Sequence, residues 1–188
     1  PQYRVLVLLS AYAALRFGEV TALRRKHLTL RNVGGRDRYE ILIQDAVSYV
    51  DGQFVVGTPK NEMGQGKVVI TSAMTDLINE YLDELSDKSE DALLFPGPDR
   101  GYLANHFLAK ALKRALKQSG LQGKAITPHS LRRAGGTEYG NSGANLSEVK
   151  EFIRDASTNA ALRYIQSTNR TIGLAESMQG PFAQSESL

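Results

Sequence analysis

Apolar residues follow a helical period at both ends of the chain and a strand-like period between them. Residues 2–15 are apolar on nearly every side, which predicts a helix at the centre of the core. A second helical stretch covers 18–26 after a break near Gly18, and Arg16 lies at that break. Between residues 39 and 71 apolar and polar residues alternate, as they do in half-buried strands.

The strand-like region contains a strong hairpin signal at Asp51-Gly52, because both residues tolerate a positive φ angle. The predicted arms of this hairpin are 46–50 and 53–56. A strand-like run at 39–43 precedes the hairpin, and 67–71 adds a third strand after the loop 59–66. We therefore expect a small three-stranded antiparallel sheet.

Helical periods return after the sheet, at about 72–85 and 103–119. Three further helix starts are marked by residues that cap helices: Thr127 before Pro128, Asn145 with Glu148 three positions later, and Ser157 or Thr158 before a helix carrying Tyr164. The predicted fold class is α+β and predominantly helical.

The amino-acid composition excludes few classes of function. A chain of 188 residues suits one domain with a core of its own. Its 23 Lys and Arg exceed its 20 Asp and Glu, and they cluster at 24–26, 110–117 and 132–133, whereas acidic residues gather at 76–91. A basic face suited to a polyanion would follow. The apolar run 5–15 is too short to span a membrane and predicts a buried helix.

Five residues together suggest cleavage of a phosphodiester. Arg16 and Arg132 offer planar, permanently charged donors, which suit the extra charge of a pentacoordinate phosphorane. His129 lies on the same helical face as Arg132, at i and i+3. Tyr164 supplies a phenol that can attack once it is activated, and Lys60, in a loop, can protonate the leaving 5′-oxygen.

Each of these residues has a simpler interpretation when taken alone. An Arg after an apolar helix is usually a solvated helix end, and Tyr164, one of 8 tyrosines, would by itself be expected to pack its ring into the core. Lys67 competes with Lys60 for the loop lysine's role. The chain has no Cys, and its 3 His lack ligand spacing, so we expect neither a metal nor another cofactor.

The order of these segments resembles the tyrosine recombinase (phage integrase) family over nearly the whole chain. Four boxes carry the resemblance: an arginine box at 14–23, Thr58-Pro59-Lys60 before a strand, a His-x-x-Arg box at 129–133 and a nucleophile box at 156–164. The resemblance implies the C-terminal catalytic-domain fold of that family. It also implies catalytic roles for Arg16, Lys60, His129, Arg132 and Tyr164, with Glu19 as a buried companion of Arg16.

One position departs from the family's pattern. Members usually have Gly-His nine residues ahead of the Tyr, and here Arg154-Asp155 stands there. That His is thought to hydrogen-bond the phosphate, whereas a carboxylate would repel it. Asp155 is therefore a candidate site residue at a position that is normally His, and its carboxylate would repel the phosphate unless it pairs with Arg154 or Arg163 or turns away.

The resemblance implies a site-specific recombinase that cleaves DNA through a 3′-phosphotyrosyl intermediate and acts as a homotetramer on two DNA sites. We expect one catalytic domain over 1–188, with a core to about 167, a tail at 168–188 that docks on a neighbouring protomer, and a core-binding domain missing upstream. A cytoplasmic, nucleoid-associated location and a mobile genetic element fit this expectation. Two alternatives stay open: a DNA-binding protein of the same fold with impaired catalysis, and a type IB topoisomerase.

Overall fold

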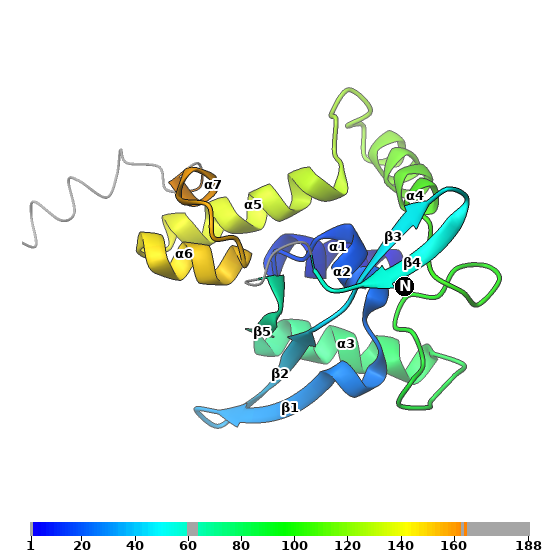
Figure 1. Cartoon of the computed structure of the whole chain (residues 1–188), viewed down its shortest axis with the longest axis horizontal. Coiled ribbons are helices and arrows are strands. Elements are labelled where there is room, and N and C mark those ends of the chain that lie inside the picture. The colour runs from blue at the N-terminus through cyan, green and yellow to red at the C-terminus, as the bar shows by residue number, and fades with distance from the viewer. Residues whose placement is uncertain (1, 60–63, 163, 165–188) are drawn as a thin grey trace, which may run out of the picture.

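Helix α1 (Gln2–Tyr12) lies at the centre of the molecule. The computed structural model describes residues 2–59, 64–162 and 164. As Figure 1 shows, the sheet and helix α3 (Ser72–Glu84) lie on one side of α1, and helices α5 (Pro128–Asn141) and α6 (Leu146–Ile153) lie on the other. α1 contacts α3 and α5 directly. The segment that follows α1 is therefore positioned between the two halves of the fold.

The predicted first helix ends three residues early, and the predicted second helix is divided. α1 ends at Tyr12, and Ala14 has the left-handed φ angle of 49°, which does not continue a right-handed helix. The stretch expected to be one helix at 18–26 consists of α2 (Phe17–Ala22) and a single 3-10 turn, η1 (Arg25–His27).

The sheet has three antiparallel strands, as predicted, but their membership differs. Its order is β1 (Leu28–Val33), β2 (Arg36–Ile43) and β5 (Gly66–Val69). We did not predict β1, in which apolar and polar residues alternate only over residues 28–31 and nearly all side chains are exposed. The predicted hairpin forms as β3 (Ala46–Val50) and β4 (Gln53–Gly57), but it is a separate two-stranded sheet.

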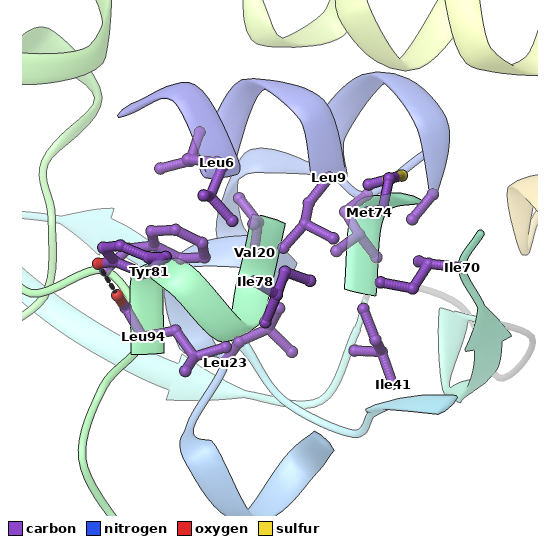
Figure 2. Packing of buried hydrophobic residues seen from close by; sticks show 14 of the residues in the cluster. Leu6, Leu9, Val20, Leu23, Ile41, Ile70, Met74, Ile78, Tyr81 and Leu94 are labelled. Atoms are coloured by element: carbon purple, nitrogen blue, oxygen red, sulfur yellow. Dashed lines mark hydrogen bonds between the residues drawn. The ribbon is translucent and has the colours of Figure 1, made fainter. Parts of the chain in front are cut away.

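The main core lies between α1, α2, the three-stranded sheet and α3. Figure 2 shows how these elements face one another, with Leu6 and Leu9 of α1 near Ile78 of α3. Tyr81 is stacked on Phe95 and donates its hydroxyl hydrogen to the carbonyl of Leu94. This core holds the start of the chain against the sheet.

The C-terminal helices form a second, smaller core. It joins α6 and α7 (Thr158–Leu162) to the segment after α1, and Tyr139 of α5 packs against it. Its buried residues are Ala14, Ala144, Val149, Ile153, Ala161 and Tyr164. The predicted helix starts are confirmed, since the side chains of Thr127, Asn145 and Ser157 accept hydrogen bonds from Ser130, Glu148 and Ala160. α4 (Asn105–Gln118) begins two residues later than predicted. No described helix is long and apolar enough to cross a membrane.

Candidate anion-binding site

The break between α1 and α2 places Arg16 at the start of α2. Arg16 is the N-cap residue, and the carboxylate of Glu19, at position N3, accepts from both its backbone nitrogen (2.9 Å) and its Nη1 (2.8 Å). Glu19 is only 1% exposed, as expected for the buried acidic companion of Arg16. The guanidinium of Arg16 stays partly exposed, with 30% of the side chain accessible. The Arg16 side chain is thus fixed by Glu19 and still partly accessible to solvent.

Helix α5 brings Arg132 to the same place. Its Nη1 donates to the carbonyl of Ala14 and its Nη2 to the carbonyl of Ile153, so one side chain joins the end of α1 to the end of α6. Only 4% of Arg132 is exposed. Burial lowers the pKa of Arg132 to about 10, and the charge of Arg16 acts in the same direction, while Glu19 opposes it. Arg132 therefore remains a cation at neutral pH.

A third buried guanidinium belongs to Arg154, which we had not named as a site residue. Arg154 is the C-cap of α6 and has the left-handed φ angle of 48°. Its Nη2 donates to Glu19 Oε2 (2.8 Å) and to the carbonyl of Ala14 (3.1 Å). Burial alone would raise the pKa of Glu19, but the charges of Arg154 and Arg16 outweigh it and hold that pKa below its ordinary value.

The expectation that Asp155 pairs with Arg154 is wrong. Its Oδ2 accepts from Arg16 Nη2 (3.2 Å) and its Oδ1 from the backbone nitrogen of Ser157 (3.1 Å), whereas Arg154 pairs with Glu19 instead. Arg163 lies outside the described residues. The carboxylate of Asp155 is therefore not turned away from the site but is paired with the guanidinium of Arg16.

Tyr164 comes to the site from the turn after α7. Its backbone nitrogen donates to the carbonyl of Ala161 (3.0 Å), and the residue is 7% exposed. A methyl group added at Gly136 would lie 3.1 Å from the Tyr164 ring, so this ring packs directly against α5 one turn after Arg132. The core-packing interpretation of Tyr164 is correct for its ring, which lies beside the helix that carries Arg132.

The structure describes only one of the two remaining predicted residues. His129 is exposed on the first turn of α5. Lys60 lies outside the described residues. Its competitor Lys67 is on β5 and pairs with Glu40 of β2 (2.8 Å), on an exposed side of the sheet. Among the residues that the structure describes, no group of three or more His, Asp or Glu is arranged to hold a metal ion.

The cluster has the charge and geometry of an anion-binding site. It combines three guanidiniums, Arg16, Arg132 and Arg154, with two carboxylates, Glu19 and Asp155, so its formal sum is one positive charge. Planar guanidinium donors suit a phosphate, and a tyrosine ring lies beside them. The fold is thus a helical α+β domain that brings three arginines and a tyrosine together in a candidate anion-binding site.

Comparison with known proteins identifies the family. A model of the phage integrase family matches residues 2–170, and the chain belongs to that family. An integrase assigned to prophage phiRv2 of Mycobacterium tuberculosis (strain ATCC 25618 / H37Rv) is 32% identical over 165 residues, which are 86% of this chain and 42% of that protein. The integrase of Mycobacterium phage L5 is 26% identical over 94% of this chain and 47% of its own length. The chain thus spans less than half the length of these relatives.

Solved structures show the same fold. The Tn1549 transposon integrase in complex with transposon right end DNA superposes with a TM-score of 0.76 at 15% identity, over 94% of this chain and 58% of that one. The XerH site-specific recombinase bound to its difH substrate superposes with a TM-score of 0.67 at 22% identity, over 95% of this chain and 47% of that one. The predicted fold class, a tyrosine recombinase catalytic domain, is confirmed.

Proposed function

We propose that this chain is the catalytic domain of a site-specific DNA recombinase. The observation that carries the proposal is the convergence of Arg16, Arg132 and Tyr164. Arg132 binds the carbonyls of Ala14 and Ile153, both residues belong to the buried cluster that contains Tyr164, and the charge of Arg16 acts on Arg132. Two guanidiniums beside a tyrosine suit a phosphodiester that a phenol attacks. Membership of the phage integrase family supports the same conclusion.

In the proposed reaction the Tyr164 oxygen attacks the scissile phosphorus, and the bond from phosphorus to the 5′-oxygen breaks. Arg16 and Arg132 stabilise the charge that grows on the two non-bridging oxygens. His129 helps to remove the phenol's proton, and Lys60 gives a proton to the leaving 5′-oxygen. The product is a 3′-phosphotyrosyl enzyme and a free 5′-hydroxyl.

Strand exchange then needs no outside energy. The phosphotyrosyl bond keeps the energy of the broken phosphodiester, so the 5′-hydroxyl of a partner strand can attack it and release Tyr164. We propose double-stranded DNA with a specific recombination site as the substrate and a homotetramer on two such sites as the active assembly. A nucleoid-associated location follows from that substrate. The tail at 168–188, which lies outside the described residues, is proposed to dock on a neighbouring protomer.

Covalent capture tests this proposal directly. Suicide duplexes, selected from a random-sequence pool by binding to the natural protein that contains this chain, would be incubated with it and resolved under denaturing conditions. The wild type should form an adduct at a 3′-phosphate, and peptide mapping should locate it on Tyr164. Tyr164→Phe should bind the duplex and form no adduct, because only the nucleophilic oxygen is removed.

Tyr139→Phe is the matched control. Tyr139 is a partly buried tyrosine of α5 that stacks on Phe152, outside the anion site, so this variant should keep the adduct. The competing function is a DNA-binding protein of the same fold without catalysis. Duplex binding without any adduct, or an adduct on another residue, would support that competitor and refute the recombinase.

A further inference from the structure

We propose that Arg154 is a positioning residue for Arg16, and that it offsets the negative charge that Asp155 brings to the same guanidinium. This inference rests on the proposed function, because it assumes that Arg16 binds a DNA phosphate. It adds a third arginine to the site and makes Arg154-Asp155 one functional unit.

The positioning role follows from a carboxylate that two arginines share. Glu19 accepts from the Arg16 backbone nitrogen and Nη1 on one side and from Arg154 Nη2 on the other, at 2.8 to 2.9 Å. Because Glu19 is almost fully buried, no solvent competes for its oxygens. The place of the Glu19 carboxylate, and therefore of the Arg16 guanidinium, depends on where Arg154 holds it.

Arg154 is itself fixed by the backbone around it. Besides Glu19, its guanidinium donates to the carbonyls of Ala13 (3.4 Å), Ala14 (3.1 Å) and Phe152 (3.2 Å). Two of these carbonyls belong to the break that sets the direction of Arg16. Arg132 binds the same Ala14 carbonyl, so both buried arginines support one backbone segment. A lysine at 154 would keep the charge but could not reach all four acceptors from one planar group.

The offset follows from the charges. Arg16 contacts two carboxylates, Glu19 and Asp155. Without Arg154 these three groups sum to one negative charge, which disfavours a phosphate at the exposed tip of Arg16. With Arg154 the four groups are neutral, and Arg132 supplies the positive charge that remains. The harm done by removing Arg154 should therefore depend on whether Asp155 is charged.

A double-mutant cycle tests this dependence. Arg154→Gly, Asp155→Asn and the double variant would be compared with the wild type in single-turnover cleavage at saturating duplex. Gly suits the left-handed backbone at 154, where φ is 48°, so the backbone itself is not strained by the change. We expect Arg154→Gly to slow cleavage by roughly 100-fold, the usual effect of misplacing a catalytic group by about 1 Å. In the Asp155→Asn protein, Arg154→Gly should slow cleavage by less than about 10-fold.

Arg36→Ala removes one positive charge from the exposed start of β2, outside the three basic clusters, and should leave the cleavage rate unchanged. Arg154→Lys keeps the charge and is the second variant if Arg154→Gly does not fold. Positioning predicts that Arg154→Lys has a lower cleavage rate at saturating DNA but wild-type duplex affinity. A purely structural role predicts instead a lower melting temperature with an unchanged rate for the folded protein. That result, or equal losses in both Asp155 backgrounds, would overturn the proposal.

Duplex affinity separates this inference from the recombinase proposal. The cycle would be repeated as binding to the same duplex in the Tyr164→Phe protein, which cannot cleave. If the wild type forms no adduct but the affinities of the Arg154 and Asp155 variants are coupled, the recombinase proposal fails and the charge offset stands. If the adduct forms but both cycles are additive, the inference fails and the recombinase proposal stands.

Discussion

Gly135→Ala should destabilise this protein although it improves the helix propensity of α5. A Cβ at Gly135 would lie 1.6 Å from the carbonyl oxygen of Ala11 and 2.8 Å from its carbonyl carbon. Both are backbone atoms of α1, so no side chain can rotate out of the way. Cβ atoms are essentially never found closer than 3.0 Å to another heavy atom, so the two helices must separate locally by about 1.4 Å.

The net effect is the difference between two opposing contributions. Replacing Gly by Ala inside a helix gains about 1 kcal/mol. Overpacking typically costs about 1–3 kcal/mol, and we expect the upper end because backbone meets backbone. A net loss of about 2 kcal/mol would lower the melting temperature by roughly 4–8 °C in a domain of this size. The same shift would move Arg132, one turn earlier on α5, from the carbonyl of Ala14.

Thermal unfolding followed by circular dichroism would measure the change. Ala134→Gly is the control, since Ala134 is the exposed neighbour on α5 and reports helix propensity without a packing contact. It should lower the melting temperature by roughly 2–4 °C. If Gly135→Ala raised the melting temperature by about that amount, the glycine would be only a weak point of the helix, and the close approach of α1 and α5 would be refuted.

Three further predictions concern the site. Gly136→Ala, whose Cβ would lie 3.1 Å from the Tyr164 ring, should change the melting temperature little but slow adduct formation by roughly 10-fold, and an unchanged rate would show that the ring position is not critical. The folded-state pKa of Glu19 is lowered from 4.5, so its carboxylate stabilises the fold above pH 4.5 and this contribution is lost as pH falls through the lower folded pKa. The difference in unfolding free energy between wild type and Glu19→Gln should therefore be constant near neutral pH and shrink in acid; a difference independent of pH would contradict the ion pairs with Arg16 and Arg154. Lys60→Ala should slow cleavage by ~10²–10⁴-fold, and a 5′-bridging sulfur in the substrate should restore most of the rate, whereas equal losses on both substrates would exclude Lys60 as the general acid.

Local signals in the sequence were sufficient for the elements whose ends depend on neighbouring residues. Thr127 and Asn145 begin α5 and α6 as predicted, because a capping side chain reaches only to the backbone three positions ahead. The Asp51-Gly52 turn is also a local signal, because these two residues themselves tolerate the positive φ angles of 49° and 81° that the turn needs. The order of the four sequence boxes was sufficient to predict the family to which the chain belongs.

Contacts between distant segments could not be predicted in this way. β5 pairs with β2 and not with the adjacent hairpin, because Val68 and Ile41 are both buried under α1 and α3 in that register. The early end of α1 at Tyr12 was also missed, since a single left-handed alanine leaves no mark in the apolar pattern.

The sequence by itself determined which chemical groups this protein has, where its capped helices begin and the order of its motifs. Only the tertiary structure decided which charges meet. Arg154 and Asp155 are neighbours in sequence, yet Arg154 pairs with Glu19 and Asp155 with Arg16, each more than 130 residues away. The reason is physical: an ion pair depends on the distance and burial of its two groups, and these are set by the packing of α1 against α5 and α6, which no local pattern records.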